Sequence, residues 1–187
     1  MSIIVAVKKG GKIVMATDSL YSFGSVKVRQ KYLSGRSKVH RFGDSYVGLV
    51  GASAHDNVFP HLTARFKDEL SFDSKEKIFN SYLLMHSILV DEYFLSKQAD
   101  ERTYEPSMIE GLIINRSGIF GIFESREVYE FKTYWAIGSG EEYALGSLFS
   151  SYDKLDDAQE LAELAVKSAC EFDDGCELPL ESFCVNI

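Results

Sequence analysis

The order in which strand-like and helix-like segments follow one another is the feature that most constrains this chain. Strand segments come in blocks and helical segments come in consecutive pairs, in the order ββ…ββ, αα, ββ(β), αα, β. A parallel sheet built from βαβ units would alternate strands with helices, so this order predicts an α+β fold. Two sheets packed face to face, with a helix pair outside each, would bury the apolar faces of the helices.

The strand segments are runs of apolar residues bounded by turn residues. The first two meet at Gly10-Gly11, a pair that accepts the positive φ angles of a tight hairpin turn. The polar stretch 19–37 is expected to be loop with a short strand inside it. Strands are expected at Ile3–Lys9, Lys12–Asp18, Ser37–Phe42, Tyr46–Val50, Met108–Asn115, Ile119–Glu124, Val128–Phe131, Tyr134–Ile137 and Leu180–Ile187.

The helical segments show apolar residues at helical spacing. The clearest are Asp73–Gln98 and Asp156–Phe172, and further helices are expected within 51–70, with Pro60 in the early part, and within 138–152. The apolar stripes of the two clear helices are Ile78, Tyr82, Leu83, Leu89, Tyr93 and Phe94 in the first, and Ala158, Leu161, Ala165, Ala169 and Phe172 in the second.

Composition excludes several classes of function. The 187 residues suit a single domain over 1–187, with 45% apolar and 26% charged residues as in an ordinary soluble globule. A net charge of −8 argues against a general nucleic-acid binder. No apolar run approaches membrane-spanning length, and no secretory signal is recognised, so we expect a cytoplasmic protein without a membrane or nucleic-acid partner.

Metal and cofactor motifs are also absent from the sequence. The three cysteines, Cys170, Cys176 and Cys184, lie outside zinc spacing and are expected to be reduced thiols. His55, Asp56 and His61 could be metal ligands, but polar residues flanking Pro60 are the better interpretation. We therefore expect neither a metal nor an organic cofactor.

Ser2 carries a possible chemistry because of its place in the chain. Met1 precedes a small residue, so an aminopeptidase could remove it and leave Ser2 with a hydroxyl and a free α-amine. The α-amine has a pKa of about 7.7–8.0, so a terminal serine can be nucleophile and base in one residue. Taken alone, Ser2 is more simply a common second residue.

Further segments favour the interpretation of Ser2 as a nucleophile over that of a common second residue. The early hairpin is followed by "ATDS", "SKVHRF", "VGLVGASA", "AIGSGEEYA" and "ACEFDDG". In this order and spacing the chain resembles the proteasome β-subunit family and its HslV-type members. The resemblance implies a four-layer αββα sandwich and an N-terminal-nucleophile (Ntn) hydrolase.

The resemblance also implies roles for single residues. Ser2 matches the nucleophile, usually threonine, Lys38 matches the catalytic lysine, and Asp18 matches the acid that pairs with that lysine. An ammonium near the terminal amine lowers the pKa of that amine, and a carboxylate holds the ammonium in place. Without the resemblance, Asp18 is a turn residue and Lys38 is a solvated lysine.

Three more positions match the family pattern. Gly51 matches the glycine whose amide forms the oxyanion hole, and it is also a natural strand-to-helix turn residue. Ser139 matches a serine near the nucleophile's amine, and Asp173 matches the acid that supports it. Their alternatives are a helix N-cap for Ser139 and a loop acid for Asp173.

The resemblance predicts a peptidase of polypeptide substrates that assembles into a homo-oligomeric ring and works with an ATP-dependent unfoldase. Two alternatives stay open: a non-catalytic scaffold subunit, and a small-molecule amidase on the same fold. The scaffold alternative is favoured by departures from the pattern in "GASAH", where Ala52 replaces a second glycine and His55 replaces an acid.

Overall fold

The structure is a computed structural model that describes residues 2–93 and 109–187. Most of its strands form two antiparallel sheets, of order β10-β1-β2-β11 and β5-β6-β7-β8-β9. The strands are β1 (Ile4–Lys9), β2 (Lys12–Thr17), β3 (Tyr21–Phe23), β4 (Val26–Val28), β5 (Val39–Phe42), β6 (Ser45–Val50), β7 (Glu110–Asn115), β8 (Gly118–Phe123), β9 (Glu127–Phe131), β10 (Tyr134–Ile137) and β11 (Glu181–Asn186).

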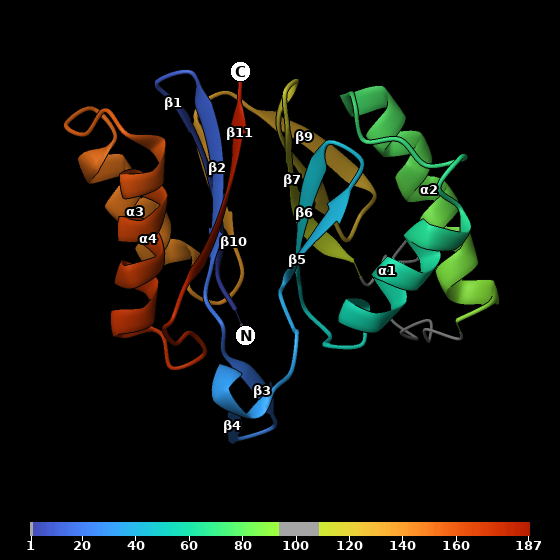
Figure 1. The fold of residues 1–187 in the computed structure, drawn as a ribbon, viewed down its shortest axis with the longest axis horizontal. Coiled ribbons are helices and arrows are strands. Elements are labelled where there is room, and N and C mark those ends of the chain that lie inside the picture. Colours follow the sequence, from blue (N-terminus) through green and yellow to red (C-terminus); the bar gives the residue numbers. More distant parts are fainter. Residues whose placement is uncertain (1, 94–108) are drawn as a thin grey trace.

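Four helices in the described residues cover the outer faces of the two sheets (Figure 1). They are α1 (His55–Arg65), α2 (Lys75–Asp91), α3 (Glu141–Ser151) and α4 (Ala158–Phe172). The pair α3 and α4 lies against the four-stranded sheet, and α1 and α2 lie against the five-stranded sheet. The four layers are the αββα sandwich that the sequence predicted.

Each interface between layers has its own apolar cluster. Ile3, Val5 and Val14 pack under α3 and α4, whereas Ile4 and Met15 point the other way, between the sheets. This alternation follows from the two-residue period of a strand. A third cluster joins the five-stranded sheet to α1 and α2. Because β1 and β2 are buried on both faces, they read as continuous apolar runs.

The hairpin between β1 and β2 has the predicted turn at Gly10-Gly11. Lys9 pairs with Lys12, and the turn residues Gly10 and Gly11 have φ angles of 59° and 73°. A β carbon at Gly10 would lie 3.0 Å from the Asp156 carbonyl, so glycine is required there for space as well as for backbone conformation.

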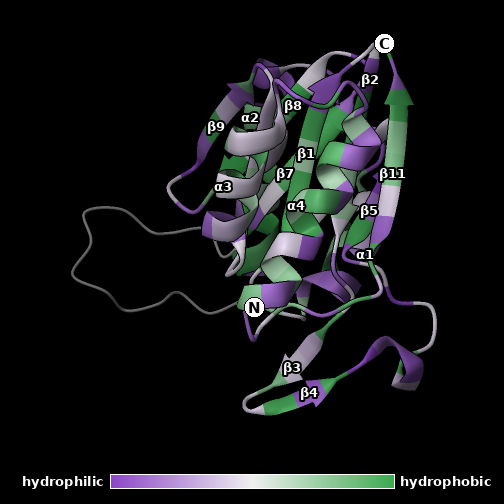
Figure 2. Ribbon diagram, turned by 90° about the vertical axis from the view of Figure 1, so that its left-hand side faces the viewer, coloured by the Kyte–Doolittle hydropathy of each residue, from purple (hydrophilic) through white to green (hydrophobic). Residues whose placement is uncertain are grey.

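The stretch 19–37 holds more structure than the single short strand expected. β3 and β4 pair as a separate two-stranded ribbon, followed by a 3₁₀ turn at Gln30–Tyr32. Figure 2 shows the ribbon projecting from the body of the molecule. Phe23 and Val26, at its tip, are each 61% exposed.

The helix starts differ slightly from the predicted ones because capping side chains decide them. The Asp157 carboxylate accepts hydrogen bonds from the Gln159 and Glu160 amides, so α4 begins at Ala158 and not at Asp156. Ser74 caps α2 in the same way, accepting from the Lys77 amide. α1 begins only at His55, after the turn at 51–54.

The predicted apolar stripes include two residues, Leu83 and Phe172, that are exposed and not buried. Leu83 on α2 is 41% exposed, because it follows the buried Tyr82 by one residue and is rotated off the buried face. Phe172 is 67% exposed and contacts the ring of Tyr143 on α3. α2 ends at Asp91, so the predicted helix is wrong at Glu92 and Tyr93, which lie beyond its end; the predicted continuation from Phe94 to Gln98 lies outside the described residues, as does Met108.

Candidate active site

Ser2 lies two residues before the start of β1 and is 8% exposed. Its backbone N–H donates to the Ser139 hydroxyl at 3.2 Å, and its carbonyl accepts from that hydroxyl at 3.4 Å. The Gly140 amide also donates to the Ser2 carbonyl, at 3.5 Å. The segment between β10 and α3 therefore holds both polar groups of the Ser2 backbone.

Asp18 follows the end of β2 and organises the buried side of the site. Its Oδ1 accepts from the Ile3 amide at 3.0 Å and from Lys38 Nζ at 2.6 Å. Its Oδ2 accepts from the Leu20 amide at 2.9 Å and from the Glu177 amide at 3.3 Å. One carboxylate thus fixes the residue after Ser2, the lysine and two loops.

The ion pair between Lys38 and Asp18 is buried, with side chains 4% and 0% exposed. A buried carboxylate needs both a counter-ion and hydrogen-bond donors to offset its lost hydration, and Asp18 has both. The Lys38 ammonium also lies 5.4 Å from the centre of the Tyr21 ring. Burial, and then the negative charge of Asp56, raises the pKa of the Tyr21 hydroxyl, so Tyr21 stays neutral.

Ser2, Lys38 and Gly51 line one cavity of about 340 Å³. Gly51 directly follows β6 and has a φ of 100°, a conformation that favours glycine. Apolar residues make up much of the remaining wall, among them Leu20, Leu49, Val50, Ala52 and Ala54. The cavity therefore joins a hydroxyl, an ammonium and an apolar wall, an arrangement that suits a polar reaction on a partly apolar ligand.

Asp173 is the C-cap residue of α4, and its carboxylate binds groups other than Ser139. Its Oδ1 accepts from the Gly175 amide at 2.7 Å, and its Oδ2 lies 3.7 Å from the Cys176 thiol, which donates to it. A β carbon on Gly140, the neighbour of Ser139, would lie 3.4 Å from Asp173 Oδ2. Asp173 therefore lies beside Gly140, and its support of Ser139 and its role in the chemistry stay predictions.

The sequence analysis missed Gly138. This residue has a φ of 106°, and a β carbon there would lie 2.2 Å from the Ser2 carbonyl oxygen. The available signal was a glycine between the strand ending at Ile137 and the helix that follows. Thr17, whose hydroxyl donates to the Ile3 carbonyl at 2.9 Å, gave no such signal.

The thiols near the site are free and protonated. None of the three cysteines forms a disulfide. Burial, and then the negative charge of Asp18, raises the pKa of Cys170 to about 12. The same two causes raise the pKa of Cys176. Neither thiol is therefore a ready nucleophile.

His55, which the sequence analysis treated as a polar residue flanking Pro60, is buried in the structure. It is 1% exposed and lies among the residues around the cavity, and neither ring nitrogen has a hydrogen-bond partner in the described part of the chain. Burial lowers its pKa, with Asp56 opposing the shift. His61 is exposed and contacts the Tyr93 hydroxyl at 2.5 Å. Across 2–93 and 109–187 no group of three side chains could hold a metal.

We expect His55 to make the protein less stable in acid. Because burial lowers its pKa in the folded state, the unfolded chain binds a proton below about pH 6.5 while the folded chain does not. The unfolding free energy should fall as pH drops below that value, by up to about 1.4 kcal/mol per pH unit. Urea unfolding from pH 7.5 to 5.5 measures this loss, and His55→Leu should reduce it.

The matched control is His61→Leu, which removes an exposed imidazole from the same helix. If His61→Leu reduced the acid slope as much as His55→Leu does, the loss of slope could not be assigned to the buried imidazole. An equal acid slope in wild type and His55→Leu would show that His55 does not titrate on unfolding.

Comparison with known proteins gives consistent results. A family model described as "Proteasome subunit" matches residues 2–178. The proteasome subunit beta of Nanoarchaeum equitans is 27% identical over 179 residues, which are 90% of this chain and 85% of that protein. The described helices include none long and apolar enough to cross a membrane.

Solved structures show the same fold. BPH from Thiobacillus denitrificans is 34% identical with a TM-score of 0.92, both alone and in complex with epoxomicin, and the match to the complex covers 98% of each chain. The match to BPH alone covers 98% of this chain and 97% of that one. HslV from Trypanosoma brucei has a TM-score of 0.71 at 16% identity, with 99% of each chain covered. The predicted fold class is confirmed.

Proposed function

The chain belongs to the proteasome-subunit family, and from this premise we propose that it is an Ntn peptidase subunit whose nucleophile is Ser2. One observation carries the proposal. The buried Asp18 carboxylate binds Lys38 Nζ at 2.6 Å and, with the same oxygen, the amide of the residue that follows Ser2. A lysine is thereby held next to the start of β1, where the free amine of a processed Ser2 would lie.

The first chemical step would use two groups of the same residue. After removal of Met1, the neutral α-amine of Ser2 takes the hydroxyl proton, directly or through a water, as Oγ attacks the peptide carbonyl. The Lys38 ammonium lowers the pKa of that amine by like-charge repulsion and keeps it basic near neutral pH. Asp18 keeps the ammonium fixed by direct contact.

The later steps follow from the same groups. The Gly51 amide would donate to the oxyanion of the tetrahedral intermediate. The α-ammonium then returns its proton to the leaving amine as the C–N bond breaks, which leaves an ester on Ser2. Water, deprotonated by the amine, hydrolyses that ester and regenerates the enzyme. Ser139 holds the Ser2 backbone in place during both attacks.

The substrates would be polypeptides, and membership of the family supports assembly into a homo-oligomeric ring with an ATP-dependent unfoldase as partner. Large apolar side chains on the outer side of α3 and α4 support such contacts, since they gather on one helix layer. They are Tyr143, Phe149, Leu164 and Phe172, all more than 40% exposed. Epoxomicin, which is bound to the Thiobacillus denitrificans relative, is proposed as a ligand here too.

The test is an intact mass followed by an activity assay. Protein purified from its native host should lack Met1, should hydrolyse a fluorogenic peptide amide, and should lose turnover when epoxomicin is added. Ser2→Ala should lower turnover by about 10⁴-fold or more, and Ser2→Thr should retain it. Ser150→Ala, on α3 and away from the cavity, is the matched control and should keep full activity.

One result would favour a scaffold subunit. If Met1 is fully retained, the Ser2 nitrogen is an amide and cannot act as a base, and wild type and Ser2→Ala should be equally inactive. Turnover that survives in Ser2→Ala would instead assign the nucleophile to another residue.

A further inference from the structure

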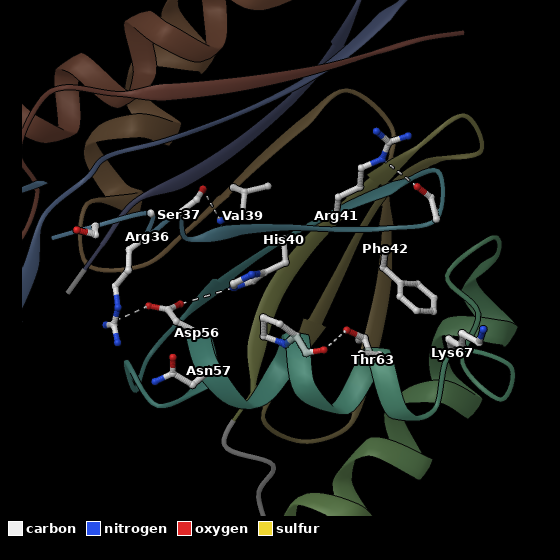
Figure 3. A pocket seen from close by; sticks show the side chains of 15 residues that line it. Arg36, Ser37, Val39, His40, Arg41, Phe42, Asp56, Asn57, Thr63 and Lys67 are labelled. Carbon is white, nitrogen blue, oxygen red and sulfur yellow. Dashed lines mark hydrogen bonds and ion pairs between the residues drawn. The ribbon is translucent and has the colours of Figure 1, made fainter.

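A second cavity, of about 810 Å³, lies beside β5 and α1 (Figure 3). Its walls are the segment 34–37, the strand β5 and one side of α1. Of the lining residues that the structure describes, only Asp56 is shared with the cavity that contains Ser2. We call this space the β5 groove; the chemistry proposed above does not use it.

The β5 groove is positively charged although the protein is acidic. The chain has 28 acidic and 20 basic residues, yet among the described residues the groove lining holds Arg36, Arg41 and Lys67 against a single carboxylate, Asp56. In Figure 3, Arg36 lies near one end of the groove, and Arg41 and Lys67 lie toward the other.

The one carboxylate cannot neutralise these charges. The Asp56 carboxylate lies 3.9 Å from the Arg36 guanidinium and 3.7 Å from His40 Nε2. Arg36 and His40 therefore share this carboxylate at one end of the groove. Arg41 donates to the neutral Gly43 carbonyl at 3.1 Å. Lys67 is exposed and has no ion pair with any residue in 2–93 or 109–187. Two basic groups at the other end are therefore available to an anionic ligand.

The backbone of the groove favours an extended ligand. In the described sheet β5 is an edge strand. The Lys38 carbonyl accepts from the Leu49 amide, so the antiparallel alternation turns the backbone groups of Val39 and Arg41 to the free edge. The Val39 amide is occupied by the Ser37 hydroxyl, at 3.2 Å. The Arg41 amide and carbonyl face the edge, where an added strand would pair.

From these two features we propose that the β5 groove binds an extended, acidic segment of a partner polypeptide, which adds to β5 as a further strand. Main-chain hydrogen bonds to Arg41 would hold the segment in register. Carboxylates on alternate residues would reach Arg36 at one end and Lys67 at the other. This binding does not depend on catalysis by Ser2.

The experiment measures binding without hydrolysis. A fluorescein-labelled decapeptide of alternating Glu and Val is titrated with the assembled Ser2→Ala protein and followed by fluorescence anisotropy. A Lys-Val decapeptide should not bind. The double variant Arg41→Glu/Lys67→Glu should weaken the Glu-Val complex by about tenfold or more. The control Lys27→Glu/Lys31→Glu makes the same charge change outside the groove lining and should alter the Kd by less than about twofold.

A second peptide tests the strand pairing. Methylation of alternate amide nitrogens keeps every charge but blocks the backbone donors, and it should abolish binding. The proposal is overturned if Glu-Val and Lys-Val peptides bind equally, if the groove variant keeps the wild-type Kd, or if the methylated peptide binds as well. It is also overturned if no peptide binds and the groove variant dissociates the assembly in sedimentation, because the groove would then be a contact between copies.

Discussion

Replacing Lys38 with methionine is expected to lower kcat for peptide-amide hydrolysis by about 10²–10⁴-fold, with assembly intact. Methionine has a similar length but no charge, so the Ser2 amine would lose the neighbour that lowers its pKa. It would be protonated near neutral pH and could not accept the hydroxyl proton. The measurement is turnover against pH, and residual activity should rise toward alkaline pH as the amine deprotonates.

The same variant should also be less stable, because it leaves a buried carboxylate without its counter-ion. Asp18 and Lys38 are almost fully buried, and removing one member of such a pair costs about 3–5 kcal/mol. The double variant Asp18→Asn/Lys38→Met removes both charges and should regain much of this stability without regaining activity. Thermal unfolding and turnover together separate the two effects.

The control for this prediction is Lys27→Met, because Lys27 is an exposed lysine on β4. It should leave both the melting temperature and kcat unchanged. Wild-type turnover in Lys38→Met would refute the assignment of Lys38, whatever happened to the stability.

Gly138→Ala is expected to abolish activity through the position of Ser2. The new β carbon would lie 2.2 Å from the Ser2 carbonyl oxygen and 2.9 Å from its carbonyl carbon, so the start of β1 must move. The positive φ of 106° adds strain for any residue other than glycine. Each of the two effects costs about 1–3 kcal/mol, and a displacement of about 1 Å can reduce the rate about 10²-fold.

Gly146→Ala provides the matched comparison. Gly146 lies within α3, and a β carbon there meets nothing within 4 Å. Alanine favours the helix over glycine by about 0.5–1 kcal/mol, so this variant should be slightly more stable and fully active. Full activity in Gly138→Ala would mean that the 138–140 segment does not position Ser2.

The elements themselves were largely predictable from local sequence. β10 was predicted with the observed ends, and the other strands of the two large sheets within one or two residues where the structure describes them. Within 19–37 one short strand was expected, but the two strands β3 and β4 are observed. Errors came where a local pattern competed with a longer-range effect. Phe172 follows the helical period of α4, yet it lies at the helix end and packs against Tyr143 outside the sandwich.

The candidate site was predictable only through the resemblance. Asp18 and Lys38 read as ordinary charged residues, because nothing local shows that side chains 20 residues apart will be buried together. Gly138 and His55 gave weaker signals. The positive φ of Gly138 and the burial of the His55 imidazole both depend on neighbours that are distant in sequence.

The sequence alone determined the type and order of the elements, the Gly10-Gly11 hairpin and the separation of strand blocks from helix pairs. These follow from side-chain periodicity and turn chemistry, which act over a few residues. Only the tertiary structure decided that Gly138 lies against the Ser2 carbonyl, and that a positively charged groove runs beside the edge of β5. Both depend on how the layers pack, because packing brings together groups that are distant in the sequence. The sequence around each group does not specify its partner.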